Sequence, residues 1–186
     1  MTVRAALVSM LAAAVLLAPA AQAADRSASL YQMHEKLLSQ DGKAIDLDVY
    51  RGQPVLVTMF YGSCPATCPL IIDTLRAVER KLDDTQRQQV RVLLVSLDAE
   101  HDTPEALRKV ANTRRVDTSR WTLAHADAAA VRRIAAALNI QYRQLPDGQF
   151  SHATIISALD AEGKILAQSE ELGRADPALL SAIGAR

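Results

Sequence analysis

Two apolar runs separated by a helical stretch constrain the fold of this chain more than any other feature. Residues 54–60 and 90–97 consist mainly of valine, leucine and other apolar residues with little polar alternation, which is typical of strands buried on both faces. Between them, apolar residues recur every three or four positions with charged residues on the other side, as in an amphipathic helix. These positions are Leu70, Ile71, Leu75, Val78 and Leu82. Two buried strands joined by a helix predict a parallel β-α-β unit, because parallel neighbours need a long crossover connection.

Turn and capping signals extend this unit toward the carboxyl end. Residues 102–105 indicate a helix start, since they combine a capping side chain with a proline in the first turn. Residues 121–123 indicate a short strand, and Asp127 opens a helix that we expect to end at Leu138. The last elements that we expect are a hairpin formed by residues 153–159 and 164–167, and a helix that starts at Asp176-Pro177.

On the amino-terminal side, Asp41-Gly42 within residues 37–47 indicates a tight turn between two short strands. The element order is therefore a hairpin, alternating strands and helices, an antiparallel hairpin and a helix. Alternating strands and helices predict an α/β fold in which helices flank a central mixed sheet on both faces. A parallel start followed by an antiparallel hairpin is the thioredoxin-like arrangement. We thus predict a thioredoxin-like domain with an N-terminal hairpin.

Residues 1–23 differ from the rest of the chain. Arg4 is the one charge in this stretch, an apolar run follows, and the small-residue end Ala21-Gln22-Ala23 closes it. This is the plan of a secretory signal peptide, and the run is too short and too alanine-rich to favour a membrane span. We therefore predict cleavage after Ala23, a periplasmic location, and a mature domain of residues 24–186 without a membrane span. An uncleaved membrane anchor is the alternative.

The charge balance and the cysteine count exclude several classes of protein. Lys and Arg total 21, and Asp and Glu also total 21, so the chain lacks the basic excess that nucleic-acid binding requires. Two cysteines are too few for a disulfide-dense mini-domain or for an all-cysteine zinc site. In an oxidising compartment, these two cysteines must form a disulfide, a redox pair or a metal site.

Both cysteines lie where the first buried strand is expected to end and the next helix to begin. Cys64 and Cys68 belong to the segment Cys64-Pro65-Ala66-Thr67-Cys68-Pro69. Sites in open α/β sheets are built at the carboxyl ends of strands, and the partial positive charge of a helix N-terminus favours the thiolate over the thiol. Residues four apart share one face of a helix, so both sulfurs could reach one small ion or each other.

Three interpretations of the cysteine pair remain open at this point. A structural disulfide would close a tiny loop and would add little stability. Thiol–disulfide enzymes of the thioredoxin type have two residues between their cysteines, whereas this chain has three, and they have Trp where this chain has Ser63. A thiolate metal site needs a third ligand, because two cysteines rarely complete a coordination shell.

Four histidines could supply that third ligand. They are His34, His101, His125 and His152. His34 is near the N-terminus, His125 precedes a helix, and capping and solvation explain the loop of His101. His152 opens the strand of the predicted final hairpin, and in a thioredoxin-like fold the loop before that strand faces the cysteine turn. Position therefore favours His152 over the other three, although a role without metal is an equal alternative on position alone.

These residues resemble the SCO/SenC copper chaperones, which are thioredoxin-like proteins that help to assemble the copper centre of cytochrome c oxidase. The family motif Cys-Pro-x-x-Cys-Pro is matched by residues 64–69, and a second segment, Val-Ser-[Ile/Val/Leu]-Asp-x-x-x-Asp-Thr-Pro, by residues 95–104. The late ligand histidine of the family aligns with His152. The family commonly has Asp before this histidine, where this chain has Ser151. The similarity extends over about residues 37–166.

The resemblance implies that Cys64, Cys68 and His152 bind a copper ion. Two thiolates and one imidazole form a soft donor set that favours Cu(I), whereas zinc would ask for a fourth ligand. The resemblance also implies the receiving partner, which is the copper-bearing subunit of cytochrome c oxidase or another periplasmic copper protein. Asp98 and Asp102 of the second motif are expected to cap their loop rather than to bind metal.

We expect a monomeric metallochaperone rather than an enzyme. The alternative is a thiol–disulfide oxidoreductase, in which Cys64 and Cys68 are the redox pair that keeps the cysteines of the oxidase subunit reduced for metal loading. A redox sensor or a peroxide-scavenging relative would need a lone nucleophilic cysteine with its own catalytic partner, and the sequence reveals no such partner.

Overall fold

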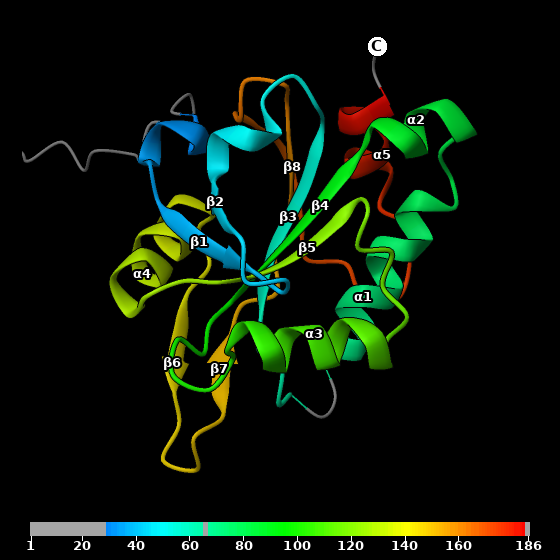
Figure 1. Ribbon diagram of the computed structural model, residues 1–186. Helices are drawn as coiled ribbons and strands as arrows, with labels where there is room; N and C mark the ends of the chain where they lie inside the picture. Colours follow the sequence, from blue (N-terminus) through cyan, green and yellow to red (C-terminus); the bar gives the residue numbers. More distant parts are fainter. Residues whose placement is uncertain (1–28, 65–66, 185–186) are drawn as a thin grey trace, which may run out of the picture.

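Seven strands form a mixed central sheet in the computed structural model, which describes residues 29–64 and 67–184 (Figure 1). Across the sheet, the strands are β2 (Ala44–Asp46), β1 (Lys36–Ser39), β5 (Trp121–His125), β4 (Arg91–Ser96), β3 (Val55–Phe60), β8 (Ile156–Leu159) and β9 (Ile165–Ser169). The three central strands β3, β4 and β5 are parallel, and the outer strands pair antiparallel with their neighbours. The predicted thioredoxin-like α/β fold with an N-terminal hairpin is confirmed. The predicted signal segment, residues 1–23, lies outside the described residues.

The parallel pair of β3 and β4 forms the centre of the sheet. Six consecutive residue pairs join the two strands, from Val55 with Arg91 to Phe60 with Ser96. Every residue of β3 is buried, as expected of a parallel strand that is covered on both faces. The ladder also aligns the carboxyl ends of the two strands, so the segments that follow Phe60 and Ser96 start side by side.

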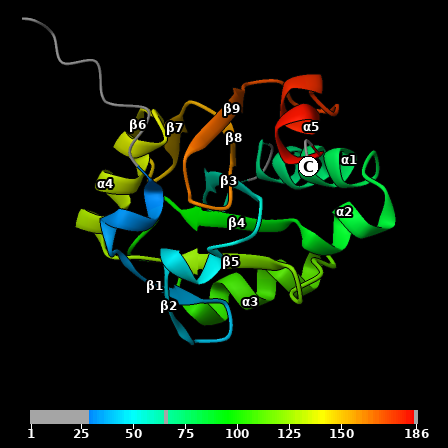
Figure 2. The same cartoon turned by 90° about the horizontal axis from the view of Figure 1, so that it is seen from above.

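Helices cover both faces of the sheet. They are α1 (Thr67–Glu79), α2 (Asp84–Gln89), α3 (Pro104–Thr113), α4 (Ala128–Ala137) and α5 (Pro177–Gly184), together with the 3-10 segments η1 (Leu30–Met33) and η2 (Leu47–Tyr50). The helices α1, α3 and α5 lie on one face and α4 on the other (Figures 1 and 2). Right-handed crossovers place α1 and α3 together, because β3, β4 and β5 follow one another across the sheet. Within the described part of the chain, no helix is both long and apolar enough to cross a membrane.

The helix starts indicated by the sequence are confirmed. Thr103 caps α3 through its side chain, and Pro104 is the first residue of that helix. Asp127 caps α4 because its Oδ1 accepts the backbone N–H groups of Ala129 and Ala130 at 2.9 and 2.8 Å. These bonds satisfy donors that have no partner inside the helix.

The short helix α2 is absent from the sequence-based expectation. Its start is a reciprocal capping box, in which Asp83 Oδ1 accepts the N–H of Gln86 at 2.8 Å and Gln86 Oε1 accepts the N–H of Asp83 at 3.1 Å. The helix has no buried residue, so it lacks the apolar stripe by which periodicity reveals a helix.

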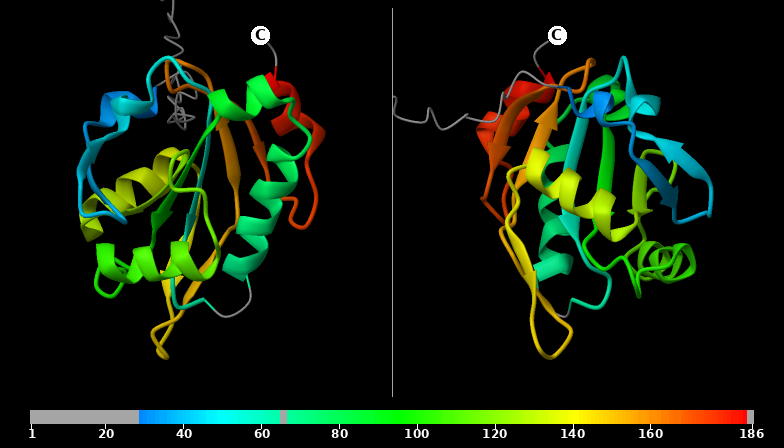
Figure 3. Two further views of the ribbon diagram at one scale, coloured as in Figure 1. Left: turned by 45° about the vertical axis from the view of Figure 1, so that its right-hand side comes forward. Right: turned by 90° about the vertical axis from the view of Figure 1, so that its left-hand side faces the viewer.

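A separate two-stranded ribbon corrects the prediction for the final hairpin. Strand β6 (Tyr142–Gln144) pairs antiparallel with β7 (Phe150–His152), and β8 begins only at Ile156. His152 therefore ends β7, and the prediction that it opens the strand of the hairpin was wrong. The ribbon projects beyond the end of the sheet at which β3 finishes (Figure 3). Strands of three residues carry too little alternation for their sequence to be separated from the next strand.

A buried carboxylate joins the end of α1 to β5. The side chain of Glu79 is 9% exposed, pairs with Arg120, and accepts the indole N–H of Trp121 at 3.0 Å. Burial of a charge is tolerated when an ion pair and a hydrogen bond compensate it.

We expect Glu79→Ala to lower the free energy of unfolding by about 1–3 kcal/mol, because it leaves the buried indole N–H of Trp121 unpaired and removes one of the two carboxylate partners of Arg120, the other being Asp117. The matched control is Asp73→Ala on the same helix. Asp73 is 67% exposed and pairs with Arg76 at 3.5 Å, so its loss should cost less than about 1 kcal/mol. Urea denaturation followed by circular dichroism measures both, and equal losses would contradict the assignment.

Candidate metal centre

A tight turn places Cys64 directly after β3. The backbone N–H of Cys64 donates to the carbonyl of Tyr61 at 3.2 Å, which closes a four-residue turn at the carboxyl end of the strand. Cys64 is 8% exposed. Cys68 is the second residue of α1, so the two cysteines occupy the strand end and the helix start that the sequence predicts. The side chains of residues 67 and 68 lie outside the described part of the structure.

The ring of Tyr61 connects this turn to the β6–β7 ribbon. It packs against Phe150 with ring centroids 5.3 Å apart, and it meets the imidazole of His152 edge to face at 6.1 Å. Tyr142, which pairs with His152 across the ribbon, lies 6.3 Å from Phe150 and completes the cluster. His152 thus lies beside the cysteine turn, although 88 positions (152 − 64) separate it from Cys64 in the sequence.

The surroundings of His152 leave one ring nitrogen available for a metal ion. Its Nδ1 is 3.1 Å from the carbonyl oxygen of Ala153, and because that oxygen only accepts, Nδ1 carries the proton of this hydrogen bond. The lone pair of Nε2 is then free to coordinate. Burial lowers the pKa of His152, which favours the neutral imidazole that metal ions bind. A thiolate sulfur and a neutral imidazole nitrogen are donors that suit Cu(I).

Ser151 takes no part in orienting this imidazole. Successive side chains of a strand point to opposite faces, and Ser151 is exposed whereas Phe150 and His152 are half-buried. Ser151 pairs with Arg143 across the ribbon. The acceptor that fixes the His152 tautomer is the Ala153 carbonyl, so the imidazole is oriented without a carboxylate at the preceding position.

Asp98 stabilises the loop that follows β4. Its Oδ1 accepts the backbone N–H groups of Glu100 and His101 at 3.2 and 3.0 Å, and both carboxylate oxygens lie 3.0 Å from His101 Nδ1. The hydrogen bond that His101 Nδ1 donates to Asp98 raises the pKa of His101, whose side chain is 66% exposed. The capping role predicted for Asp98 agrees with these contacts.

Asp102 makes a contact that the sequence does not reveal. Its Oδ2 accepts the backbone N–H of Gly62 at 2.7 Å and the hydroxyl of Ser96, so this carboxylate links the loop after β4 to the cysteine turn. Burial raises the pKa of the Asp102 carboxyl, and the hydrogen bonds from Ser96 and Gly62 act in the opposite direction. Thr103, not Asp102, caps α3.

The other two candidate histidines, His34 and His125, have different surroundings. His34 follows η1 with a left-handed backbone (φ 51°), and His125 ends β5 with a buried Nδ1 that has no hydrogen-bond partner among the described residues. Within residues 29–64 and 67–184, no three His, Cys, Asp or Glu side chains gather closely enough to hold a metal ion. The ligand set expected from the sequence includes Cys68, whose side chain is not part of that search.

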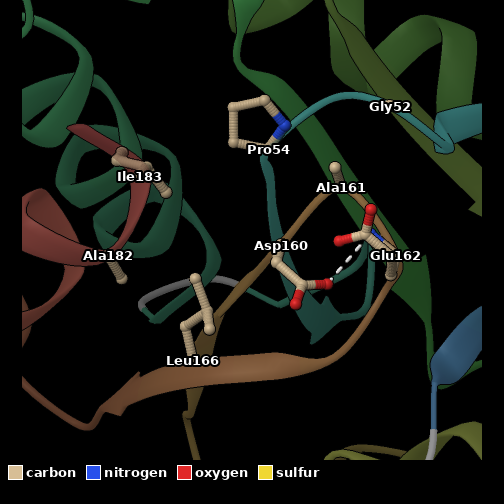
Figure 4. A pocket seen from close by; sticks show the side chains of 8 residues that line it. All are labelled: Gly52, Pro54, Asp160, Ala161, Glu162, Leu166, Ala182 and Ile183. Carbon is tan, nitrogen blue, oxygen red and sulfur yellow. Dashed lines mark hydrogen bonds between the residues drawn. The ribbon is translucent and has the colours of Figure 1, made fainter. Parts of the chain in front are cut away.

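A pocket of about 300 Å³ lies at the opposite end of β3 (Figure 4). Gly52 and Pro54 line it together with the β8–β9 turn and part of α5. The carboxylate of Asp160 in this pocket already accepts the backbone N–H groups of Glu162 and Lys164 at 2.9 and 2.8 Å, so it stabilises the turn. Among the described residues, its lining gathers no group of three His, Cys, Asp or Glu side chains that could hold a metal ion.

Known proteins share this architecture. A family model described as SCO1/SenC matches residues 23–182. The SCO1 protein homolog of Bacillus subtilis is 28% identical over 83 residues, which are 45% of this chain and 42% of the relative, so the match spans less than half of its length. The copper-bound structure of Bradyrhizobium japonicum ScoI has a TM-score of 0.65 at 22% identity and covers 81% of this chain and 96% of its own. BsSco, described as a disulfide-switch member of the Sco family of cytochrome c oxidase assembly proteins, has a TM-score of 0.66 at 22% identity over 81% and 90%.

The fold and the strand-end turn define a thioredoxin-like protein with a Cys-Pro-x-x-Cys-Pro segment. Because the family model covers most of the sequence, the chain belongs to the SCO1/SenC family. The resemblance that residues 64–69 and 95–104 indicate is thereby confirmed.

We expect His101 and His152 of the metal-free protein to titrate on opposite sides of their ordinary value of 6.5, with His101 above it and His152 below it. His101 therefore contributes stability that is present at low pH and is lost as the pH rises through its folded-state pKa. His152 contributes stability that is present above pH 6.5 and is lost as the pH falls through its folded-state pKa. Proton NMR of the imidazole C–H signals measures both values. Asp98→Asn should lower the pKa of His101 alone, and an equal shift of both histidines would contradict the local cause.

Proposed function

We propose that this protein is a copper chaperone, which binds one Cu(I) ion through Cys64, Cys68 and His152 and delivers it to the copper centre of cytochrome c oxidase. The observation that carries the proposal is the ring contact between Tyr61 and His152, because it joins the imidazole to the turn that bears Cys64. Membership of the SCO1/SenC family supports the proposal, and so does the copper bound to Bradyrhizobium japonicum ScoI.

In this proposal the copper ion is cargo. Two thiolates and one imidazole are soft donors, and they leave the coordination shell of the ion incomplete. A thiolate of the receiving protein can therefore enter the shell before a cysteine of this chain leaves. Each ligand must be deprotonated to bind, and the low pKa that burial gives His152 keeps its imidazole neutral without the ion.

The proposed setting is the periplasm. Residues 1–23 would be removed on export, and residues 24–186 would act as a monomer without a membrane span. The receiving partner is the copper-bearing subunit of the oxidase or another periplasmic copper protein. The balanced charge of the chain argues against nucleic acid as a partner.

A second candidate function uses the same cysteines. Here the Cys64 and Cys68 thiols reduce a disulfide of the oxidase subunit, so that the target gains two thiols and this chain gains a disulfide. The position of the pair at a strand end and a helix start favours this chemistry, and the relative BsSco is described as having a disulfide switch.

We expect Cys64→Ser and Cys68→Ser each to abolish Cu(I) binding that survives a competing chelator, because one thiolate and one imidazole cannot hold Cu(I) against it. His152→Ala should weaken binding by at least about tenfold, since even the residues around metal ligands are worth that much. Anaerobic titration of the reduced protein in competition with a Cu(I) chelator measures all three. The matched control is His101→Ala, which removes an exposed histidine of the loop after β4 and should bind as the wild type does. Wild-type affinity in either cysteine variant would disprove the ligand set.

The variant His152→Ala also separates the two candidate functions. It keeps both sulfurs, so it should still form and break the Cys64–Cys68 disulfide in a glutathione equilibrium. A chaperone predicts that this variant fails to support oxidase assembly in cells at limiting copper. A thiol reductant predicts normal assembly with His152→Ala and failed assembly with the cysteine variants. Wild-type copper affinity together with wild-type assembly in His152→Ala would exclude the three-ligand site.

A further inference from the structure

The buried carboxylate of Asp102 meets the cysteine turn at one defined point. Its Oδ2 accepts the N–H of Gly62 at 2.7 Å and the hydroxyl of Ser96, and the residue is 4% exposed. The Ser96 hydroxyl oxygen in turn accepts the N–H of Asp98 at 3.0 Å. A chain of hydrogen bonds therefore runs from the loop after β4, through Asp102, to the backbone between Tyr61 and Cys64.

Position 62 has room for this carboxylate because glycine has no side chain. It is the second residue of the turn that the bond from Cys64 N–H to Tyr61 C=O closes. A Cβ atom at position 62 would lie 2.6 Å from Asp102 Oδ1 and 3.3 Å from a methyl group of Val110. The absence of a side chain thus permits the carboxylate to approach the backbone of the turn.

The other roles open to Asp102 do not fit its contacts. It does not cap α3, because the side chain of Thr103 does so. It is not arranged as a metal ligand, because two donors converge on Oδ2 and the residue is 4% exposed. The groups that hold it come from the end of β4 and from the cysteine turn.

We propose that Asp102 is a positioning residue of the metal centre, which holds the turn from Tyr61 to Cys64 through the Gly62 N–H and so fixes the Cys64 thiolate for Cu(I). The inference rests on the proposed function for its link to copper. One part of it is independent of copper, namely that Asp102 helps to keep Cys64 buried by holding its turn.

The test compares Asp102→Ala with Asp102→Asn and with a matched control. The amide oxygen of Asn can still accept from Gly62 and Ser96, so this variant retains the hydrogen bonds and loses the charge. The control is Glu35→Ala. Glu35 is a buried carboxylate that accepts two hydrogen bonds from Arg133 of α4, one of them at 2.7 Å, away from the turn. Thermal unfolding checks that each variant folds and shows how much stability it loses.

Two readouts are measured on the purified, reduced protein. The first is Cu(I) affinity against a competing chelator, which we expect Asp102→Ala to lower by about tenfold to a hundredfold. The second is the rate at which iodoacetamide alkylates Cys64 in a Cys68→Ser background, which should rise by about fivefold or more when local opening of the turn exposes the sulfur. Asp102→Asn and Glu35→Ala should stay within about threefold of the wild type in both readouts. If Asp102→Ala matches Glu35→Ala in both, the inference is overturned.

Gly62→Ala tests the same link if Asp102→Ala does not fold. Its Cβ must displace the carboxylate, so it should lower copper affinity and speed the alkylation of Cys64 in the same way. In the double variant with Asp102→Ala, the added methyl group meets no carboxylate, so the two effects should not add. Additive effects would overturn the inference. If the wild type binds no Cu(I), the proposed function fails, and the alkylation rates alone decide the role of Asp102.

Discussion

The parallel ladder between β3 and β4 is the interaction on which the candidate site depends. Six residue pairs hold the two strands in one register, and the N–H of Leu97 continues the pattern by donating to the carbonyl of Phe60 at 2.7 Å. The two segments that carry the family motifs therefore leave the sheet at the same level and side by side. The bond between Asp102 and Gly62 then closes the gap between them. Two motifs about 30 residues apart in sequence become one structural unit because parallel strands present their carboxyl ends together.

The histidine reaches this unit by a different physical route. His152 lies on a ribbon whose strands pair with each other and not with the central sheet, so no ladder fixes its distance from the cysteines. Aromatic packing does so instead, through the contacts of Tyr61 with Phe150 and His152. Such contacts are worth about 0.5–1.5 kcal/mol each beyond the area that they bury. The turn that bears Cys64 is thus held by hydrogen bonds, and the imidazole of His152 by weaker ring packing.

The sequence could predict the elements that have an apolar pattern and not those that lack one. The buried runs of β3 and β4, the apolar stripe of α1 and the capped starts of α3 and α4 all carry local signals, and all are confirmed. The helix α2 and the ribbon strands are short and half-exposed, so they carry no such signal. The sequence predicts the position of Cys64, because the apolar run shows where the preceding strand ends. It does not predict the contacts of Tyr61 and Asp102, because these contacts join segments that only the folded chain brings together.

The structure also bears on the choice between carrier and reductant. A reductant must bring its two sulfurs to about 2.0 Å when the disulfide forms, and must separate them again in each cycle. A carrier gains from the opposite property, because thiolates held in place lose less conformational freedom when the ion binds. The turn of Cys64 is closed by its own backbone bond and is held from outside by Asp102. The imidazole beside it has one nitrogen engaged by the Ala153 carbonyl and a pKa that burial lowers. An imidazole prepared in this way gives nothing to a disulfide, which contains only sulfur, whereas in the proposed copper site it would be the third donor, so this arrangement favours the carrier.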